Sequence, residues 1–299
     1  MAWRIVAINN PAYLSNSRNQ LLVKQDEEIS VPIEDIDTLL IDSYGVSLSA
    51  QLLSFLGQNN TTVVLCNDKH LPVSTILPYS QHSRQAKMSA AQLALSGPFK
   101  KQLWRKIIEQ KICNQAEVLR RFDLKNDDLF AMSQIVKSGD TTNRESLAAR
   151  FYFARLLEDA TRRKPLWHNS ALNYGYALVR SSLARQIAAR GFIASQGLFH
   201  RSELNGFNLA DDLIEPFRPI VDFYVMHDIA PFHVGEYDTS LSQRDRALLV
   251  DILNNHAIIN CKKFTLKHAV EVHVESFSQA ITYNSAEMIT LPQLPPYEP

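Results

Sequence analysis

Cysteine is scarce in this chain of 299 residues, which contains only Cys66, Cys113 and Cys261. The number is odd and the three residues lie far apart. They therefore match neither a disulfide framework nor the paired spacing of a structural zinc site. This pattern excludes the disulfide-rich secreted class and predicts thiols that stay reduced, as in the cytoplasm.

Long apolar segments are missing as well. No run approaches the ~20 apolar residues that cross a bilayer. The opening residues, MAWRIVAINN, lack the charged start and the long apolar core of a signal peptide. An internal repeat is also absent. We therefore expect a cytoplasmic protein that does not enter a membrane.

The chain carries no net charge, because 31 Lys and Arg balance 31 Asp and Glu. The total therefore gives no indication of nucleic-acid binding, but the charges are unevenly distributed. Residues 1–80 hold 4 basic and 8 acidic side chains, residues 81–222 hold 22 and 14, and residues 223–299 hold 5 and 9. The basic middle segment indicates either a helical surface with its own ion pairs or a surface that binds a polyanion. Charge alone favours neither.

The first eighty residues read mostly as strands. Trp3–Ile8 is rich in β-formers, and Ala12–Lys24 predicts a hairpin that turns within Ser15–Asn19. A short helix is expected over Ser47–Asn59, with Ser47 or Ser49 as its cap.

From Gln81 onward the apolar residues recur at the helical period. Helices are expected over 99–122, Arg144–Arg163, Ala171–Ala189, Ser242–Asn255 and Cys261–Phe277. The fold class is therefore α+β. We expect a small β-rich N-terminal domain over 1–79, a larger all-α catalytic domain over 80–290, and a disordered Pro-rich tail over 291–299.

The stretch GLFHRSELNGFNLADDLIEPFRP, residues 197–219, gathers His200 and several acids in a short span. A helix is expected over 205–226, and Pro216 and Pro219 must bend it. Glu215 follows Asp211 by four residues and Asp212 by three, so these like charges share a face and repel. A bound cation, or the arginines Arg201 and Arg218, should offset them. On spacing alone a solvated ion-pair network is favoured. The single His-x-x-Glu at His200 and Glu203 lacks the second histidine of a zinc protease.

A further acid, Glu145, opens the predicted helix at 144–163. At that position a carboxylate commonly caps a helix or complements its dipole, and without other information the cap is the favoured interpretation. Two carboxylates and one neutral imidazole would also suit a hard divalent cation such as Mg²⁺ or Mn²⁺. Beside a basic helical surface, such an ion would act on a nucleic-acid backbone. Spacing does not compel this hypothesis.

Four stretches together resemble a known family. They are IDTLLIDSYGVSLSAQLLSFLGQNNTTVVLCND (36–68), ESLAARFYF (145–153), LNYGYALVRSSLARQIAARG (172–191) and GLFHRSELNGFNLADDLIEPFRPIVD (197–222). In this order and separation they resemble the CRISPR-associated integrase of spacer acquisition, the family called Cas one. The resemblance covers nearly the whole chain. Glutamate at position 215, where many relatives have aspartate, resembles the compact type II branch.

The resemblance implies a homodimeric, metal-dependent DNA integrase and endonuclease that inserts DNA fragments into a CRISPR array. Carried over by position, Glu145, His200 and Glu215 would be catalytic and would bind Mg²⁺ or Mn²⁺. Asp211 or Asp212 would assist, with Asp212 favoured. The implied partners are a double-stranded DNA fragment, CRISPR repeat DNA, a small ferredoxin-like adaptation protein and, in this branch, the RNA-guided effector. Candidate DNA contacts are His82, Arg84, Lys87, Lys100, Lys101, Arg105, Arg144 and Arg201.

Two other hypotheses remain open from the sequence. The same site could cut branched DNA with water in place of the 3′-hydroxyl, which would make the protein a structure-selective nuclease. Alternatively, the acids and His200 could be structural parts of a DNA-binding scaffold. For any single basic residue in the list, a solvated helix face is the favoured interpretation.

Overall fold

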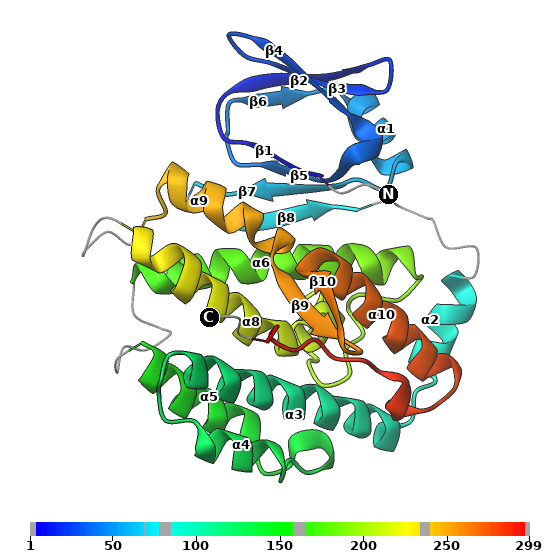
Figure 1. The fold of residues 1–299 in the computed structure, drawn as a ribbon. Helices are drawn as coiled ribbons and strands as arrows, with labels where there is room; N and C mark the ends of the chain where they lie inside the picture. The colour runs from blue at the N-terminus through cyan, green and yellow to red at the C-terminus, as the bar shows by residue number, and fades with distance from the viewer. Residues whose placement is uncertain (1–3, 69, 78–84, 158–165, 234–239, 297–299) are drawn as a thin grey trace.

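The structure is a computed structural model and describes residues 4–68, 70–77, 85–157, 166–233 and 240–296. Figure 1 shows most of the strands gathered in the N-terminal part of the molecule, and helices with one further pair of strands in the rest. The expected α+β fold class is therefore confirmed. The predicted domain boundary at 79/80 lies outside the described residues. Among the described helices, none combines the length and the apolar character needed to cross a membrane.

Two four-stranded sheets form the N-terminal part. The first has the order β1 (Arg4–Ile8), β5 (Ile36–Ile41), β7 (Thr62–Cys66) and β8 (Pro72–Ile76), and the second has the order β4 (Glu28–Pro32), β3 (Gln20–Lys24), β2 (Ala12–Ser17) and β6 (Val46–Leu48). The predicted hairpin is confirmed as the β2–β3 pair, with a turn at Arg18 and Asn19. Helix α1 (Ala50–Gln58) is capped by Ser49, whose hydroxyl accepts the Leu52 N–H at 3.1 Å.

Strand β5 lies in the middle of the molecule, and all six of its residues are buried. Leu39 packs into an apolar cluster between the two sheets, whereas Leu40 packs into the cluster of the helical part. A strand buried on both faces needs apolar side chains on both, and this explains why IDTLLI does not alternate cleanly. The first sheet is therefore a layer shared by the two halves of the protein.

The helical part comprises α2 (Gln85–Leu93), α3 (Gly97–Arg121), α4 (Asp127–Ser133), α5 (Arg144–Leu156), α6 (Trp167–Ala189), α7 (Asn208–Leu213), α8 (Arg218–Tyr224), α9 (Gln243–Val250) and α10 (Leu266–Thr282). Helix α6 packs on the first sheet and on α8, and α8 packs in turn on α3 (Figure 1). The long helices α3 and α6 thus frame the segment that contains the acidic motif.

The expected helix over Cys261–Phe277 is wrong in its first part. His256–Ile259 and Lys262–Thr265 pair as the antiparallel strands β9 and β10. The turn between them places Asn260 and Cys261 at positive φ, which a helix cannot continue through. Helix α10 begins only at Leu266. The helical part is therefore not purely α.

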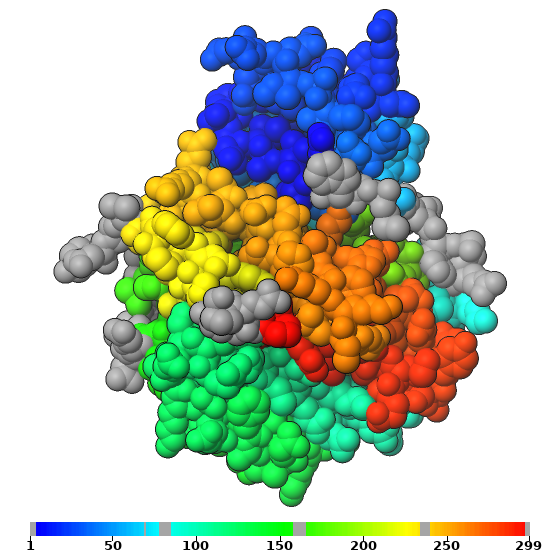
Figure 2. Space-filling model, in the orientation of Figure 1, coloured from blue at the N-terminus to red at the C-terminus, as the bar shows by residue number. Residues whose placement is uncertain are grey.

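The C-terminal tail was expected to be disordered, and for residues 291–296 this is wrong. Gln293 and Ile258 exchange two backbone hydrogen bonds of 2.8 Å, and Leu294 is buried. Asn114 of α3 donates to the Pro292 carbonyl at 2.9 Å. Figure 2 shows this end of the chain, in red, between the orange and the blue-green surfaces. Proline suits an extended segment of this kind because it has no backbone N–H that would need an acceptor.

Buried His273 of α10 predicts a pH-dependent stability. Burial lowers the pKa of His273 to about 4, although its bond to the Thr290 carbonyl opposes the shift. Between that value and the pKa of about 6.5 in the unfolded chain, only the unfolded state binds the proton. Stability should therefore fall by about 2 kcal/mol from pH 7.5 to pH 5 through this group. Urea unfolding at both pH values measures the loss, and His273→Asn should lack most of it. Equal losses in both proteins would contradict the assignment.

Candidate active site

A buried carboxylate organises the loop before α7. Asp212 is fully buried, and its Oδ2 accepts the backbone N–H groups of Leu198 and Phe199 at 2.5 and 3.1 Å. Its Oδ1 accepts the backbone N–H of His200 at 3.1 Å and contacts the imidazole Nδ1 at 2.7 Å. A Cβ at Gly197 would lie 2.6 Å from the same carboxylate, so only glycine fits there. Asp212 thus fixes both the loop and the ring.

The His200 side chain remains 42% exposed although its Nδ1 is held. Because Asp212 accepts from Nδ1, the neutral ring carries its proton there and keeps the Nε2 lone pair available. The Asp212 hydrogen bond raises the pKa of His200 above its ordinary value, with the charges of Glu215 and Asp211 acting in the same direction. The ring also meets Trp104 of α3 edge-on, with the centroids 5.8 Å apart.

The bend predicted from Pro216 and Pro219 is present and places Glu215. Helix α7 ends at Leu213, a 3₁₀ turn spans Glu215–Phe217, and α8 begins at Arg218. Within this break the Glu215 carboxylate is buried. Its Oε1 accepts from Arg218 Nε at 3.0 Å, and its Oε2 contacts the ammonium of Lys111. Burial alone would raise the pKa of Glu215, but these two cations outweigh it and lower the pKa to about 2.

Glu145 lies in the first turn of α5, but its side chain does not cap the helix. Asp140 performs that task, because its carboxylate accepts the backbone N–H groups of Arg144 and Glu145 at 2.8 and 3.0 Å. The Glu145 carboxylate instead contacts Lys111 Nζ. The capping interpretation of this acid is therefore wrong. Lys111 joins it to Glu215, about seventy residues later in the chain.

The donor set suits a hard divalent cation, since it offers two carboxylates and an imidazole whose other nitrogen is held by a carboxylate. In the described part of the chain, however, no three His, Cys, Asp or Glu side chains converge closely enough to hold an ion. The ammonium of Lys111 lies between Glu145 and Glu215 in this structure. The residues therefore fit the metal by their chemistry and would have to rearrange to bind it.

The structure assigns the two neighbouring acids different partners. Asp211 pairs with Arg180 of α6 through Nε and Nη2, at 2.5 and 3.1 Å. Asp212 is the acid that reaches His200, and its expected assistance to the metal stays a prediction. Four donors already fill its two oxygens, so the contacts support positioning of His200 rather than direct ligation.

The predicted DNA contacts scatter over several elements. His82 and Arg84 lie outside the described residues. Lys87 is exposed on α2, and Lys100 and Lys101 lie in the first turn of α3. The remaining three candidates are arginines. Arg105 pairs with Glu109 at 3.3 Å. Arg201, next to His200 in the sequence, is exposed, and Arg144, next to Glu145, is half-buried. Their roles in DNA binding stay predictions.

Several residues of the site were missed from the sequence, and Lys111 is the most important. Its sequence signal was present, because Lys111 interrupts an apolar stripe formed by Ile107, Ile108 and Ile112 at helical spacing. A charge in such a stripe is buried and needs a partner. Phe199 had no comparable signal. Its ring stacks on Trp104 with the centroids 4.4 Å apart, yet it is 51% exposed next to His200.

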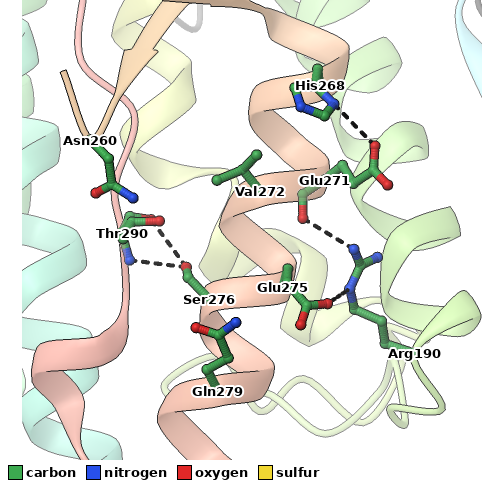
Figure 3. Close-up of a pocket in the computed structure, with 9 residues that line it drawn as sticks. All are labelled: Arg190, Asn260, His268, Glu271, Val272, Glu275, Ser276, Gln279 and Thr290. Atoms are coloured by element: carbon green, nitrogen blue, oxygen red, sulfur yellow. Dashed lines mark hydrogen bonds and ion pairs between the residues drawn. The ribbon is translucent and has the colours of Figure 1, made fainter. Parts of the chain in front are cut away.

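A separate pocket of about 400 Å³ lies along α10. Figure 3 shows its charged groups turned toward one another: Arg190 Nε binds Glu275 at 3.0 Å, and His268 Nδ1 contacts Glu271 at 3.2 Å. None of the predicted site residues lines it. Its two acids are partly exposed, whereas Glu215 and Asp212 are buried, so the acid–histidine cluster is the better candidate for the active site.

Comparison with known proteins agrees with the resemblance seen in the sequence. Residues 5–249 match the family described as CRISPR associated protein Cas1. A CRISPR-associated endonuclease Cas1 from Neisseria meningitidis is 40% identical over 300 residues, covering 99% of this chain and 98% of the relative. Another, from Francisella tularensis subsp. novicida, is 25% identical and covers 89% and 92% of the two chains.

Solved structures show the same fold. A casposase bound to integration product superposes with a TM-score of 0.76 at 19% identity, covering 95% of this chain and 92% of the other. A Cas1 protein from Thermotoga maritima gives a TM-score of 0.74 at 17% identity, with 99% and 100% covered. The family match covers most of the sequence, and one relative is 40% identical along nearly its full length. This chain therefore belongs to the Cas1 family of CRISPR-associated proteins.

Proposed function

We propose that this protein is a metal-dependent DNA integrase that inserts DNA fragments into a CRISPR array. The observation that carries the proposal is the pairing of His200 with buried Asp212 in a chain of the Cas1 family. The charge of Glu215, which belongs to the Glu145–Lys111–Glu215 cluster, acts on the same imidazole. A casposase solved in complex with its integration product shares this fold, which supports the same kind of reaction.

The reaction would be a transesterification. The 3′-hydroxyl of the fragment attacks a repeat phosphodiester and loses its proton, one P–O bond forms while another breaks, and a hydroxyl is released on the repeat strand. Because the number of phosphodiester bonds is unchanged, no ATP is needed. Glu145, His200 and Glu215 would hold Mg²⁺ or Mn²⁺. When bound, such an ion lowers the pKa of the attacking hydroxyl and stabilises charge on the phosphate.

The chain's own residues would prepare this chemistry. Asp212 holds His200 with Nδ1 protonated, so that Nε2 is available without a change of tautomer. Arg218 keeps Glu215 ionised in a buried position. Arg144 and Arg201 stand next to proposed ligands in sequence and would contact the scissile phosphate. Lys87, Lys100, Lys101 and Arg105 would contact the backbone of the incoming DNA, together with His82 and Arg84.

The proposed partners are those implied by the family resemblance. They are a second copy of this chain, the fragment and repeat DNA, a small ferredoxin-like adaptation protein and the RNA-guided effector. Solved complexes named Cas6-RT-Cas1–Cas2 contain a chain with this fold, matched at a TM-score of 0.75 and 17% identity. This supports assembly with a small Cas protein. The cytoplasmic location and the type II branch remain predictions.

A structure-selective nuclease is the second candidate, because the relatives carry the name endonuclease. The same residues would serve both reactions, since water and a 3′-hydroxyl are alternative attacking groups. A DNA-binding scaffold with a structural acid–histidine cluster is the third possibility.

A strand-transfer assay tests the proposal. A fluorescent duplex with free 3′-hydroxyls, a plasmid with a CRISPR repeat, the small partner and Mn²⁺ or Mg²⁺ should give label at the repeat edge. The label should be absent with EDTA. His200→Ala should reduce the rate below about 1% of wild type while DNA affinity and circular dichroism stay unchanged. Cleavage without transfer would favour the nuclease, and binding without either reaction would favour the scaffold.

A further inference from the structure

Lys111 is a buried lysine in the middle of α3. It lies on the face of the helix that carries Ile107, Ile108 and Ile112, and only 6% of the residue is exposed. Its ammonium contacts Glu145 of α5 and Glu215 of the 3₁₀ turn. The lysine therefore stands between the two carboxylates that we propose as ligands of the metal.

The local charges balance in this arrangement. Glu145 and Glu215 supply two negative charges, and Lys111 and Arg218 supply two positive ones. A divalent ion added to this cluster would leave an excess of two positive charges in a partly buried site, which is strongly unfavourable. One of the two cations must therefore give up its contact when a metal binds.

Lys111 is the cation that can move. Arg218 binds the other oxygen of Glu215 and lies over the Tyr176 ring, 4.8 Å from its centroid. A planar guanidinium held on two sides is fixed, whereas an ammonium on a four-carbon stem can rotate away. Both acids meet Lys111 at a single atom, Nζ.

We propose that Lys111 is an internal counter-ion: its ammonium holds Glu145 and Glu215 together in the metal-free protein and leaves them when a divalent ion binds. The inference rests on the proposed function. It makes metal binding a competition with Lys111 and assigns the lysine a positioning role. The negative charge of a DNA phosphate would offset the excess positive charge, so DNA should strengthen metal binding in the wild-type protein.

Metal binding can be measured directly from the electron paramagnetic resonance of free Mn²⁺, without reference to activity. Lys111→Met in the full-length protein should bind Mn²⁺ at least about tenfold more tightly than wild type. It should also melt at a lower temperature in EDTA, because buried Glu215 and half-buried Glu145 lose their shared counter-ion, and Mn²⁺ should restore most of the loss. Lys111→Gln, which is neutral but polar, should change the affinity in the same direction.

The matched control is Lys106→Met on the same helix, where the lysine pairs with Glu287 at 2.6 Å, away from the cluster. It should bind Mn²⁺ as wild type does. Unchanged or weaker binding by folded Lys111→Met or Lys111→Gln would overturn the inference. A crystal structure of the wild-type protein with Mn²⁺ tests it without any variant. Lys111 Nζ still touching both carboxylates there would overturn it as well.

The two proposals can fail separately. If the wild-type protein binds Mn²⁺ in a manner that His200→Ala removes, and the Lys111 variants bind it equally well, only the role of Lys111 is wrong. If neither the wild type nor the Lys111 variants bind Mn²⁺, with or without DNA, the proposed metal-dependent function is wrong and the inference is overturned with it.

Discussion

Asp212→Ala is expected to abolish strand transfer and to destabilise the protein. The carboxylate is fully buried and serves three backbone N–H groups and the His200 ring. Removing it leaves these donors without their acceptor at a position that is fully buried. The free energy of unfolding should fall by about 4 kcal/mol, since each buried unsatisfied group costs about 1–3 kcal/mol and such costs are not fully additive. Urea unfolding measures this loss.

The effect on activity has a separate cause, because His200 would lose the acceptor that fixes its tautomer and orientation. Strand transfer should fall by about a hundredfold, at the upper end of the range for residues that support a metal ligand. The matched control is Asp211→Asn at the neighbouring acid, which pairs with Arg180 and should cost about 1 kcal/mol or less. Asp212→Ala with wild-type activity would show that His200 needs no support from this residue.

Glu215→Ala is expected to have the second large effect. The substitution leaves Lys111 and the Arg218 guanidinium near each other without their shared carboxylate. Breaking a buried ion pair by removing one partner typically costs about 3–5 kcal/mol, because the remaining charge is uncompensated. Activity should also be lost, since the proposed metal loses a ligand. Chemical denaturation and the strand-transfer assay report the two effects independently.

A second substitution separates the charge effect from a packing effect. In the double variant Lys111→Met/Glu215→Ala the orphaned ammonium is gone, so about half of the stability lost in Glu215→Ala should return. Transfer activity should not return, because the carboxylate is still missing. If the double variant is no more stable than Glu215→Ala, the loss comes from the cavity rather than from the buried charge. Glu203→Ala, an exposed acid of the same motif, should leave stability unchanged.

The prolines of the acidic motif show how far sequence reasoning reached. Pro216 and Pro219 predicted a bend, and the helix breaks at Glu215 as expected. The bend depends on local chemistry, because proline lacks the N–H that the helix needs.

The outcome differed for Glu145, where local rules favoured a cap. Asp140, in the preceding turn, takes the backbone N–H groups instead. The geometry of the loop before the helix decides which of two nearby acids reaches the helix end. The spacing of the acids in the sequence does not specify that geometry.

The sequence by itself determined the α+β class, the order of the main helices, the β2–β3 hairpin and, through its ordered motifs, the family. Each of these follows from local propensity, from periodicity or from the identity of residues in order. Only the tertiary structure decided that Lys111 joins Glu145 to Glu215, that Asp212 rather than Asp211 holds His200, and that residues 291–296 pack against the helical part. These contacts join residues that are distant in the chain. A buried charge needs a partner, and the packing of α3, α5 and the bent segment decides which partners are within reach.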